Sequence, residues 1–138
     1  MKKEKGRFKI IDKPYKIILF SFLLTFFGLF LSWSSVMIWI KTEANKFANQ
    51  AVLEYQSDKT EALLMKIFDE NSSIDEKNTA IWALGTLKAE EALEELEKLE
   101  DIISEEDEEF GISSYELEKA ILKIKGEFRG SWQVSKND

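Results

Sequence analysis

The pattern of hydrophobic and polar positions sets one uncharged stretch apart from the rest of the chain. Residues 17–40, reading IILFSFLLTFFGLFLSWSSVMIWI, contain no Asp, Glu, Lys or Arg. A helix of this length reaches about 36 Å, which is enough to cross a hydrocarbon core of about 30 Å with some tilt. The pattern therefore predicts a transmembrane helix over residues 17–40.

Small and hydroxyl residues inside this stretch recur at steps of three and four, which places them on one stripe of a helix. In lipid, helices associate through close approach at small residues and through interhelical hydrogen bonds. We therefore predict a packing seam, and the alternative is that the hydroxyls bond to carbonyls of their own helix. This span seam comprises Ser21, Thr25, Gly28, Ser32 and Ser35.

Apolar positions keep helical spacing after the span. Over residues 41–56 they predict that the membrane helix continues outward as a stalk whose apolar stripe packs on the following domain, rather than as a detached helix lying on the membrane. The stripe contains Ala44, Phe47, Ala48, Ala51, Val52 and Tyr55.

Four further helices are predicted from apolar spacing and from capping residues. Ser57-Asp58 precedes the first helix, which ends near Asn71, and Ser73 with Glu76 forms a capping box for the second. A third helix covers residues 89–103, and the acidic segment 104–111 is predicted to be a loop. Ser113 with Glu116 opens the fourth helix, and a tail follows in which Phe128, Trp132 and Val134 are candidates to dock.

An internal repeat connects these helices. Glu-Ala-Leu at residues 61–63 recurs at residues 91–93, and a second set of four residues recurs forty positions on. Two helix pairs, the second lengthened by the acidic loop, explain both spacings and point to an α-solenoid. The second set is Ser73, Glu76, Ala80 and Ile81, matched by Ser113, Glu116, Ala120 and Ile121.

Residues 75–85, DEKNTAIWALG, followed by Glu91-Ala92-Leu93, resemble the HEAT-like repeats first described in phycobilin lyases. The match rests on a basic residue three positions before an alanine and on a closing Ala-Leu-Gly. The second copy departs from the pattern, because Leu117 replaces the basic residue. The resemblance covers about residues 58–126 and implies a fold and protein binding, with no lyase activity carried over. Its signature residues are Lys77, Ala80, Ala83, Leu84, Gly85, Ala92, Leu93 and Ala120.

The expected fold is therefore all-α, with one transmembrane helix followed by a short HEAT-like α-solenoid of about two helix pairs. We divide the chain into a basic tail, a transmembrane helix, a stalk, a repeat domain and a C-terminal tail. Their ranges are 1–16, 17–40, 41–56, 57–126 and 127–138.

Charge is distributed unevenly about the span. Residues 1–16 hold 7 Lys and Arg against 2 Asp and Glu, whereas residues 41–138 hold 12 against 24. Positively charged residues favour the cytoplasmic side, so we expect a cytoplasmic N-terminus and an extracytoplasmic domain. The basic tail suits the anionic lipid of the bilayer, and the acidic domain argues against a nucleic-acid partner.

Composition also bears on chemistry. The chain has no Cys and no His, so it lacks the usual disulfide, the commonest general base and the commonest metal ligand. The acidic run 105–109 lacks the alternating ligands and bend glycine of a calcium loop, so loose cation attraction is the alternative to a solvated charge run. We expect no enzyme activity, no cofactor, no metal site and no small-molecule substrate.

Two tryptophans require a choice between core and surface. Trp82 is expected mainly in the core, with a surface anchor for a partner protein as the alternative, because Ile81, Leu84 and Leu87 can form the inward stripe without it. For Trp132 the two interpretations are equal. Both are candidate protein contacts.

These observations suggest a membrane-anchored interaction module, an adaptor or accessory subunit of a membrane or envelope complex. Its partner would be another protein, and a homo-oligomer stays open. One alternative is a small regulator of a membrane transporter or enzyme that acts through the span. Another, weaker alternative is a pigment-lyase-like accessory factor.

The span should be retained as a signal-anchor, because a cleaved signal usually has an apolar core of about 7–15 residues and a small-residue cleavage site. Sequencing the N-terminus of the mature protein should therefore give a chain that still contains residues 17–40. A chain starting near Ala44 or Ala51 would instead identify a cleaved signal peptide.

Overall fold

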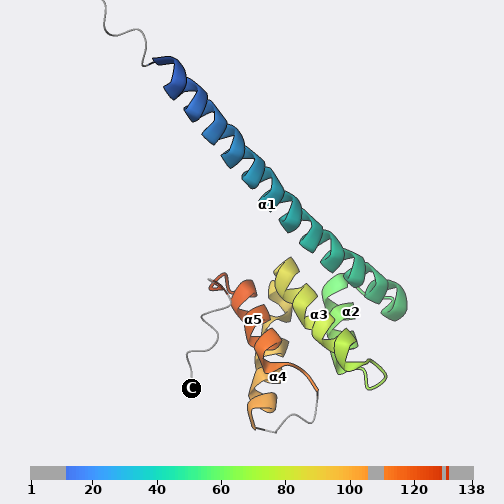
Figure 1. Ribbon diagram of the computed structural model, residues 1–138. Coiled ribbons are helices and arrows are strands. Elements are labelled where there is room, and N and C mark those ends of the chain that lie inside the picture. The colour runs from blue at the N-terminus through green and yellow to red at the C-terminus, as the bar shows by residue number, and fades with distance from the viewer. Residues whose placement is uncertain (1–11, 106–110, 129, 131–138) are drawn as a thin grey trace, which may run out of the picture. The chain divides into compact units, whose positions relative to one another are not determined.

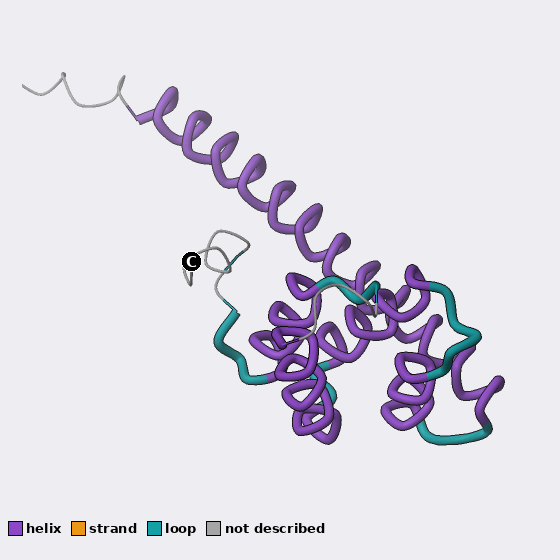
Figure 2. Tube along the Cα trace, turned by 90° about the horizontal axis from the view of Figure 1, so that it is seen from below, coloured by secondary structure: helices purple, strands orange, loops and turns teal. Residues whose placement is uncertain are grey.

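The protein is all-helical over the residues that its structure, a computed structural model, describes (Figures 1 and 2). These are residues 12–105, 111–128 and 130, with the side chains of 12–14, 104 and 105 left out. No strand occurs in these ranges, which confirms the expected all-α class. The elements are α1 (Asp12–Tyr55), α2 (Lys59–Phe68), α3 (Ile74–Leu87), the 3₁₀ turn η1 (Glu90–Ala92), α4 (Leu93–Glu105) and α5 (Ser114–Ile124).

Helix α1 is 44 residues long and includes the whole predicted span without a break. It is long and apolar enough to cross a membrane, and no residue from Tyr15 to Trp39 is buried. Pro14 lies in the first turn, where a missing backbone N–H costs no helical hydrogen bond. By their internal contacts the described residues divide into two units, with the boundary between Trp39 and Ile40.

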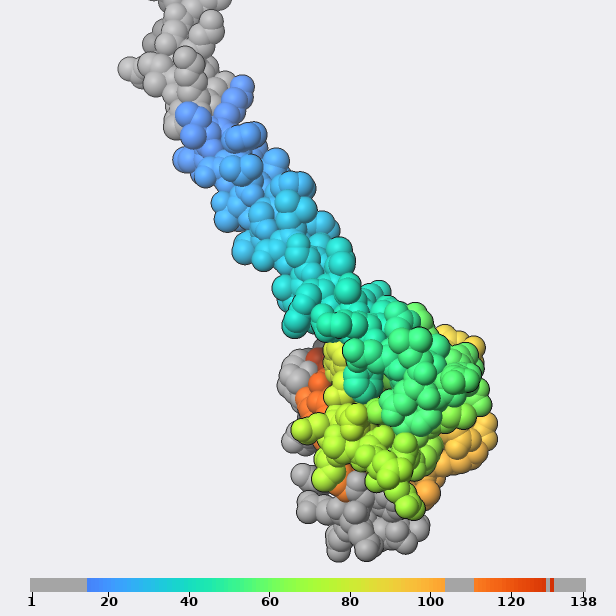
Figure 3. Space-filling view, turned by 90° about the vertical axis from the view of Figure 1, so that its right-hand side faces the viewer, coloured from blue at the N-terminus to red at the C-terminus, as the bar shows by residue number. Residues whose placement is uncertain are grey.

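The last part of α1 belongs to the second unit, as the stalk prediction required. Ala44 and Ala48 are completely buried and Ala51 is 2% exposed, and all three join the core of that unit. In the space-filling view this end of α1 and the residues of α2 and α3 form one continuous surface (Figure 3). The helix ends at Tyr55, and the next residue, Gln56, has a left-handed backbone with φ 54° and donates its N–H to the Val52 carbonyl.

Helices α2 and α3 form an antiparallel hairpin with the predicted caps. The Asp58 carboxylate accepts hydrogen bonds from the backbone N–H groups of Thr60 and Glu61. Ser73 and Glu76 form the complete capping box, in which each side chain accepts from the other residue's backbone N–H. Both predicted N-termini are therefore confirmed.

Helices α4 and α5 form the second hairpin, with two corrections to the prediction. The segment 104–111 is not a loop throughout, because α4 continues to Glu105 and keeps the turn of Ile103 that packs on the core; residues 106–110 lie outside the described ranges. The second capping box is only half formed. The Ser113 hydroxyl accepts from the Glu116 N–H, but the Ser113 N–H donates to Asn78 Oδ1 at 2.9 Å instead of to Glu116.

The two hairpins meet through α3 and α5. Asn78 bonds to Ser113, and a Cβ placed on Gly85 would lie 2.7 Å from the Cα of Ala120. Each contact joins residues 35 positions apart, so α3 and α5 run in the same direction. At Gly85 the two backbones approach so closely that any side chain would force them to shift.

The hydrophobic core lies between the stalk and the four helices that follow. Each fully buried Leu or Ile contributes about 1.5–3 kcal/mol through burial, so the free energy of burial is spread over several side chains. The largest fully buried side chains are Leu63, Ile67, Ile81, Leu84, Leu96 and Leu117.

Replacing Gly85 with alanine should destabilise the domain. Forcing a methyl group against Ala120 costs about 1–3 kcal/mol, and the better helix propensity of alanine recovers about 1 kcal/mol of it. We expect urea unfolding of the full chain in detergent micelles, followed by circular dichroism, to show a lower midpoint for Gly85→Ala.

Ala120→Gly is a partial control, since it removes the Cβ of Ala120, which would lie 2.9 Å from a methyl group on Gly85, and leaves the Ala120 Cα at 2.7 Å. In the double mutant the part of the cost that comes from the Cβ contact should be relieved, so the two changes should be non-additive by up to about 1 kcal/mol. An unchanged or higher midpoint for Gly85→Ala alone would show that the close approach does not limit the size of residue 85.

Candidate functional site

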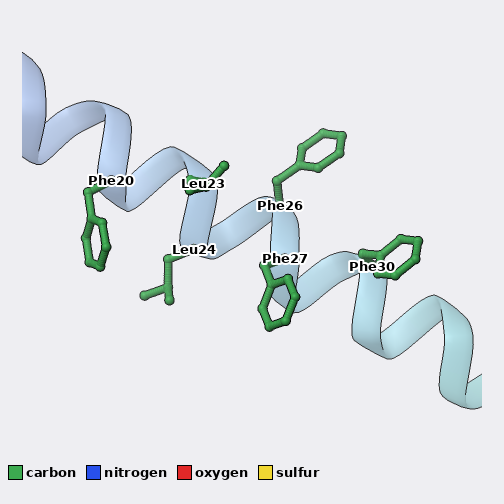
Figure 4. Close-up of a pocket in the computed structure, with 6 residues that line it drawn as sticks. All are labelled: Phe20, Leu23, Leu24, Phe26, Phe27 and Phe30. Atoms are coloured by element: carbon green, nitrogen blue, oxygen red, sulfur yellow. The ribbon is translucent and has the colours of Figure 1, made fainter.

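The span presents two different faces. At about 100° per residue, the span seam occupies an arc of about 80°. A bulky apolar face, made of Phe20, Leu23, Leu24, Phe26, Phe27 and Phe30, lies on the other side, and Figure 4 shows these side chains spreading outward from the helix. The hollows between them are open, apolar and formed by one helix, so this face is suited to contact lipid rather than to bind a ligand.

Two hydroxyls of the span seam are partnered within their own helix. Thr25 Oγ1 donates to the Ser21 carbonyl and Ser35 Oγ donates to the Leu31 carbonyl, each at 2.9 Å. This is the alternative stated above for these side chains. Such bonds also allow these hydroxyls to face a second helix without an unsatisfied donor. The surface beside Gly28 is open, because a Cβ placed there would meet nothing within 4 Å. The seam, including Ser32, remains a prediction.

The repeat-signature residues are mainly packing residues. Lys77 and Leu93 are half-buried, while the others lie in the core. None of the group offers a nucleophile or a general base, so the signature explains packing and not chemistry. The buried members are Ala80, Ala83, Leu84, Gly85, Ala92 and Ala120.

A charged cluster joins the end of α1 to α2 and α3. Lys66 is only 7% exposed, and its Nζ lies 2.7 Å from Glu54 Oε2 and 3.1 Å from Glu76 Oε1. Beside it, the Tyr55 hydroxyl donates to Asp69 at 2.7 Å. Sequence reasoning missed this cluster, although Lys66 stands next to Ile67 on the buried face of α2.

The cluster shifts the pKa of its members. Burial alone lowers the pKa of Lys66, but its hydrogen bonds to Glu54 and Glu76 outweigh burial and raise that pKa above its ordinary value. The backbone N–H and hydroxyl of Ser73, together with Lys66, lower the pKa of Glu76 to about 2. The Lys66 ammonium is neutralised by two carboxylates, so the cluster fixes the end of α1 on α2 and α3 and is a poor candidate for proton transfer.

Trp82 lies between the core and the surface. Ile81 and Leu84 are completely buried in the core. The Trp82 ring is partly buried and lines a shallow hollow between α3 and α5. The expected core position is therefore only half right. The hollow has a volume of about 460 Å³, and its lining residues are Asp75, Asn78, Thr79, Trp82, Glu116 and Lys119.

Other predicted features lie outside the described part of the chain. They are Trp132 and Val134, most of the basic tail 1–16, and the acidic side chains of residues 105–109. Within the residues that are described, no group of three or more Asp or Glu side chains is arranged to hold a metal ion.

Comparisons of the chain with protein-family models, curated proteins and solved structures find no match. A function for this chain therefore has to be inferred from its own surfaces.

Acid should weaken the domain through Glu76. Its pKa is about 2 in the folded protein, against an ordinary value of 4.5, so its stabilising effect is present above pH 4.5 and is lost as pH falls toward 2. Glu76→Gln keeps the capping-box acceptor but cannot titrate. We expect its free energy of unfolding to depend less steeply on pH in this window, by up to about one proton.

The control is Glu90→Gln, an exposed carboxylate in η1 with no ion pair among the described residues. Unfolding of the full chain in micelles at a series of pH values would measure both variants. An unchanged slope for Glu76→Gln, or an equal change for Glu90→Gln, would contradict the assigned role of Glu76.

Proposed function

We propose that the chain is a membrane-anchored protein-interaction module, an adaptor or accessory subunit of a membrane or envelope complex, without catalysis of its own. The observation that carries this proposal is the unbroken helix α1, which passes from an uncharged span into the core of a small helical domain. A domain attached in this way is held at a membrane surface, where it can meet only a limited set of partners.

The arrangement of the hairpins supports a HEAT-like repeat. Two antiparallel helix pairs follow one another, their second helices run in parallel, and Gly85 of the Ala-Leu-Gly motif lies at the close approach. Repeats of this kind need neighbours on both sides to bury their apolar faces. The stalk covers α2 and α3, and a partner protein would extend the stack or fill the face formed by α3 and α5.

The charge distribution supports the orientation. Seven cationic residues precede the span, and only Lys41, Lys46 and Lys59 follow it within about twenty residues. We therefore place the N-terminus in the cytoplasm and the domain outside it. In that position the acidic domain would be available to other proteins of the envelope.

A second candidate is a regulator that binds a membrane protein through the span. The span seam favours it, because small residues and internally bonded hydroxyls line one side of α1 while bulky side chains line another. The two candidates predict different contact residues, so one experiment separates them.

Affinity capture of the tagged full chain, crosslinked in native membranes, should recover a defined partner that mass spectrometry identifies. If the domain holds the partner, Trp82→Ala should reduce the recovered amount severalfold and the double variant Gly28→Leu, Ser32→Leu should not. The opposite result would favour the span. A partner held equally by both variants and by the wild type would contradict the two assignments.

Matched controls are available on other faces. Phe68→Ala removes an aromatic ring that is 53% exposed at the end of α2, and Phe20→Leu with Phe27→Leu alters the bulky face of the span. Both controls should retain the partner. Failure to recover any protein with the wild-type chain would overturn the proposed function.

A further inference from the structure

We propose that the hollow at Trp82 binds a cationic side chain, preferably arginine, presented by a segment of the partner protein. This inference rests on the proposed function and names the chemistry of its contact.

The hollow is built by the parallel packing of α3 and α5. The bond between Asn78 and Ser113 and the close approach at Gly85 fix the two helices on either side of it. Trp82 stands between these contacts, while Ile81 and Leu84 already fill the core. The ring is thus held in place by packing, and its outer part lines a recess large enough for one side chain.

The neutral polar groups of the hollow already have partners. The Thr79 hydroxyl donates to the Asp75 carbonyl at 2.7 Å. The Asn78 amide oxygen accepts from the Ser113 N–H, and its nitrogen contacts the Gly111 carbonyl at 3.5 Å. Few donors or acceptors are therefore left to recognise a neutral polar ligand.

The charges leave one carboxylate in excess. Lys119 Nζ lies 3.0 Å from Glu116 Oε1 and 5.2 Å from the centre of the Tyr115 ring, so its charge is compensated. Asp75 is exposed at the rim and forms no ion pair with any described residue. Among the described residues the hollow therefore has one uncompensated negative charge, at Asp75, and no uncompensated positive charge.

An arginine satisfies both features of the hollow. Its planar guanidinium can lie on the indole ring of Trp82, where a cation is attracted to the aromatic face, and it can donate two hydrogen bonds to the Asp75 carboxylate. Lysine would supply the charge without the flat stacking surface. The excess of acid in residues 41–138 would also favour approach of a basic segment.

The test uses the full chain in nanodiscs and a library of twelve-residue peptides displayed on phage. Selected peptides should be enriched in arginine. Their binding should weaken about fivefold or more with Trp82→Ala, and similarly with Asp75→Asn, which keeps the size of the side chain and removes its charge. Glu90→Gln and Phe68→Ala serve as controls and should bind as the wild type does.

The outcomes separate this inference from the proposed function. Selected peptides without a cationic residue, or peptides bound equally by Asp75→Asn, would overturn the inference even where affinity capture still recovers a partner through Trp82. Failure to select any peptide would overturn it as well. Recovery of no partner in native membranes would instead overturn the proposed function.

Two other occupants are tested in the same assay. A chain ending after Phe128 that alone binds the peptides would assign the hollow to the C-terminal tail, and crosslinks between two copies at the hollow would assign it to a homo-oligomer. Either result would overturn a partner protein as the occupant.

Discussion

The close approach of α3 and α5 is the contact on which the rest of the domain depends. Gly85 allows the backbones to meet at Ala120, and this position determines where both hairpins lie in the core. The same close approach determines how far apart the two helices lie at Trp82, where the hollow between them begins. The recess at Trp82 is therefore a product of helix packing and needs no special loop.

Charge is handled differently in the two units. The uncharged span has no ionic group to shield, whereas the domain buries Lys66 and surrounds it with Glu54 and Glu76. A buried ion pair contributes little net stability compared with apolar packing, but it penalises any arrangement that separates the partners. We infer that the cluster selects one position for the end of α1 on α2 and α3.

Much of the fold could be predicted from sequence because its signals are local. Capping residues at Asp58 and Ser73 determined helix starts, and apolar spacing identified the buried faces. One error arose where distant residues compete for the same group. Asn78 replaces Glu116 as the partner of the Ser113 N–H, and no local pattern indicates a contact 35 positions away.

The candidate sites were predictable to a smaller extent for the same reason. Trp82 was recognised as a residue that could lie in the core or at the surface, but its neighbours Glu116 and Lys119 come from another helix, so the recess could not be seen in the sequence. Lys66 was missed because its partners Glu54 and Glu76 lie on two other helices. In both cases the sequence identified the residue but not the residues of other helices that surround it.

The amide of Asn78 has a consequence for how this chain can change. It holds the backbone on both sides of Ile112, through the Gly111 carbonyl and the Ser113 N–H, at the point where the chain enters α5. The start of α5 is therefore fixed by contacts from α3. Because lengthening a loop costs little free energy, the connection between α4 and α5 can gain residues during evolution while the core keeps its register.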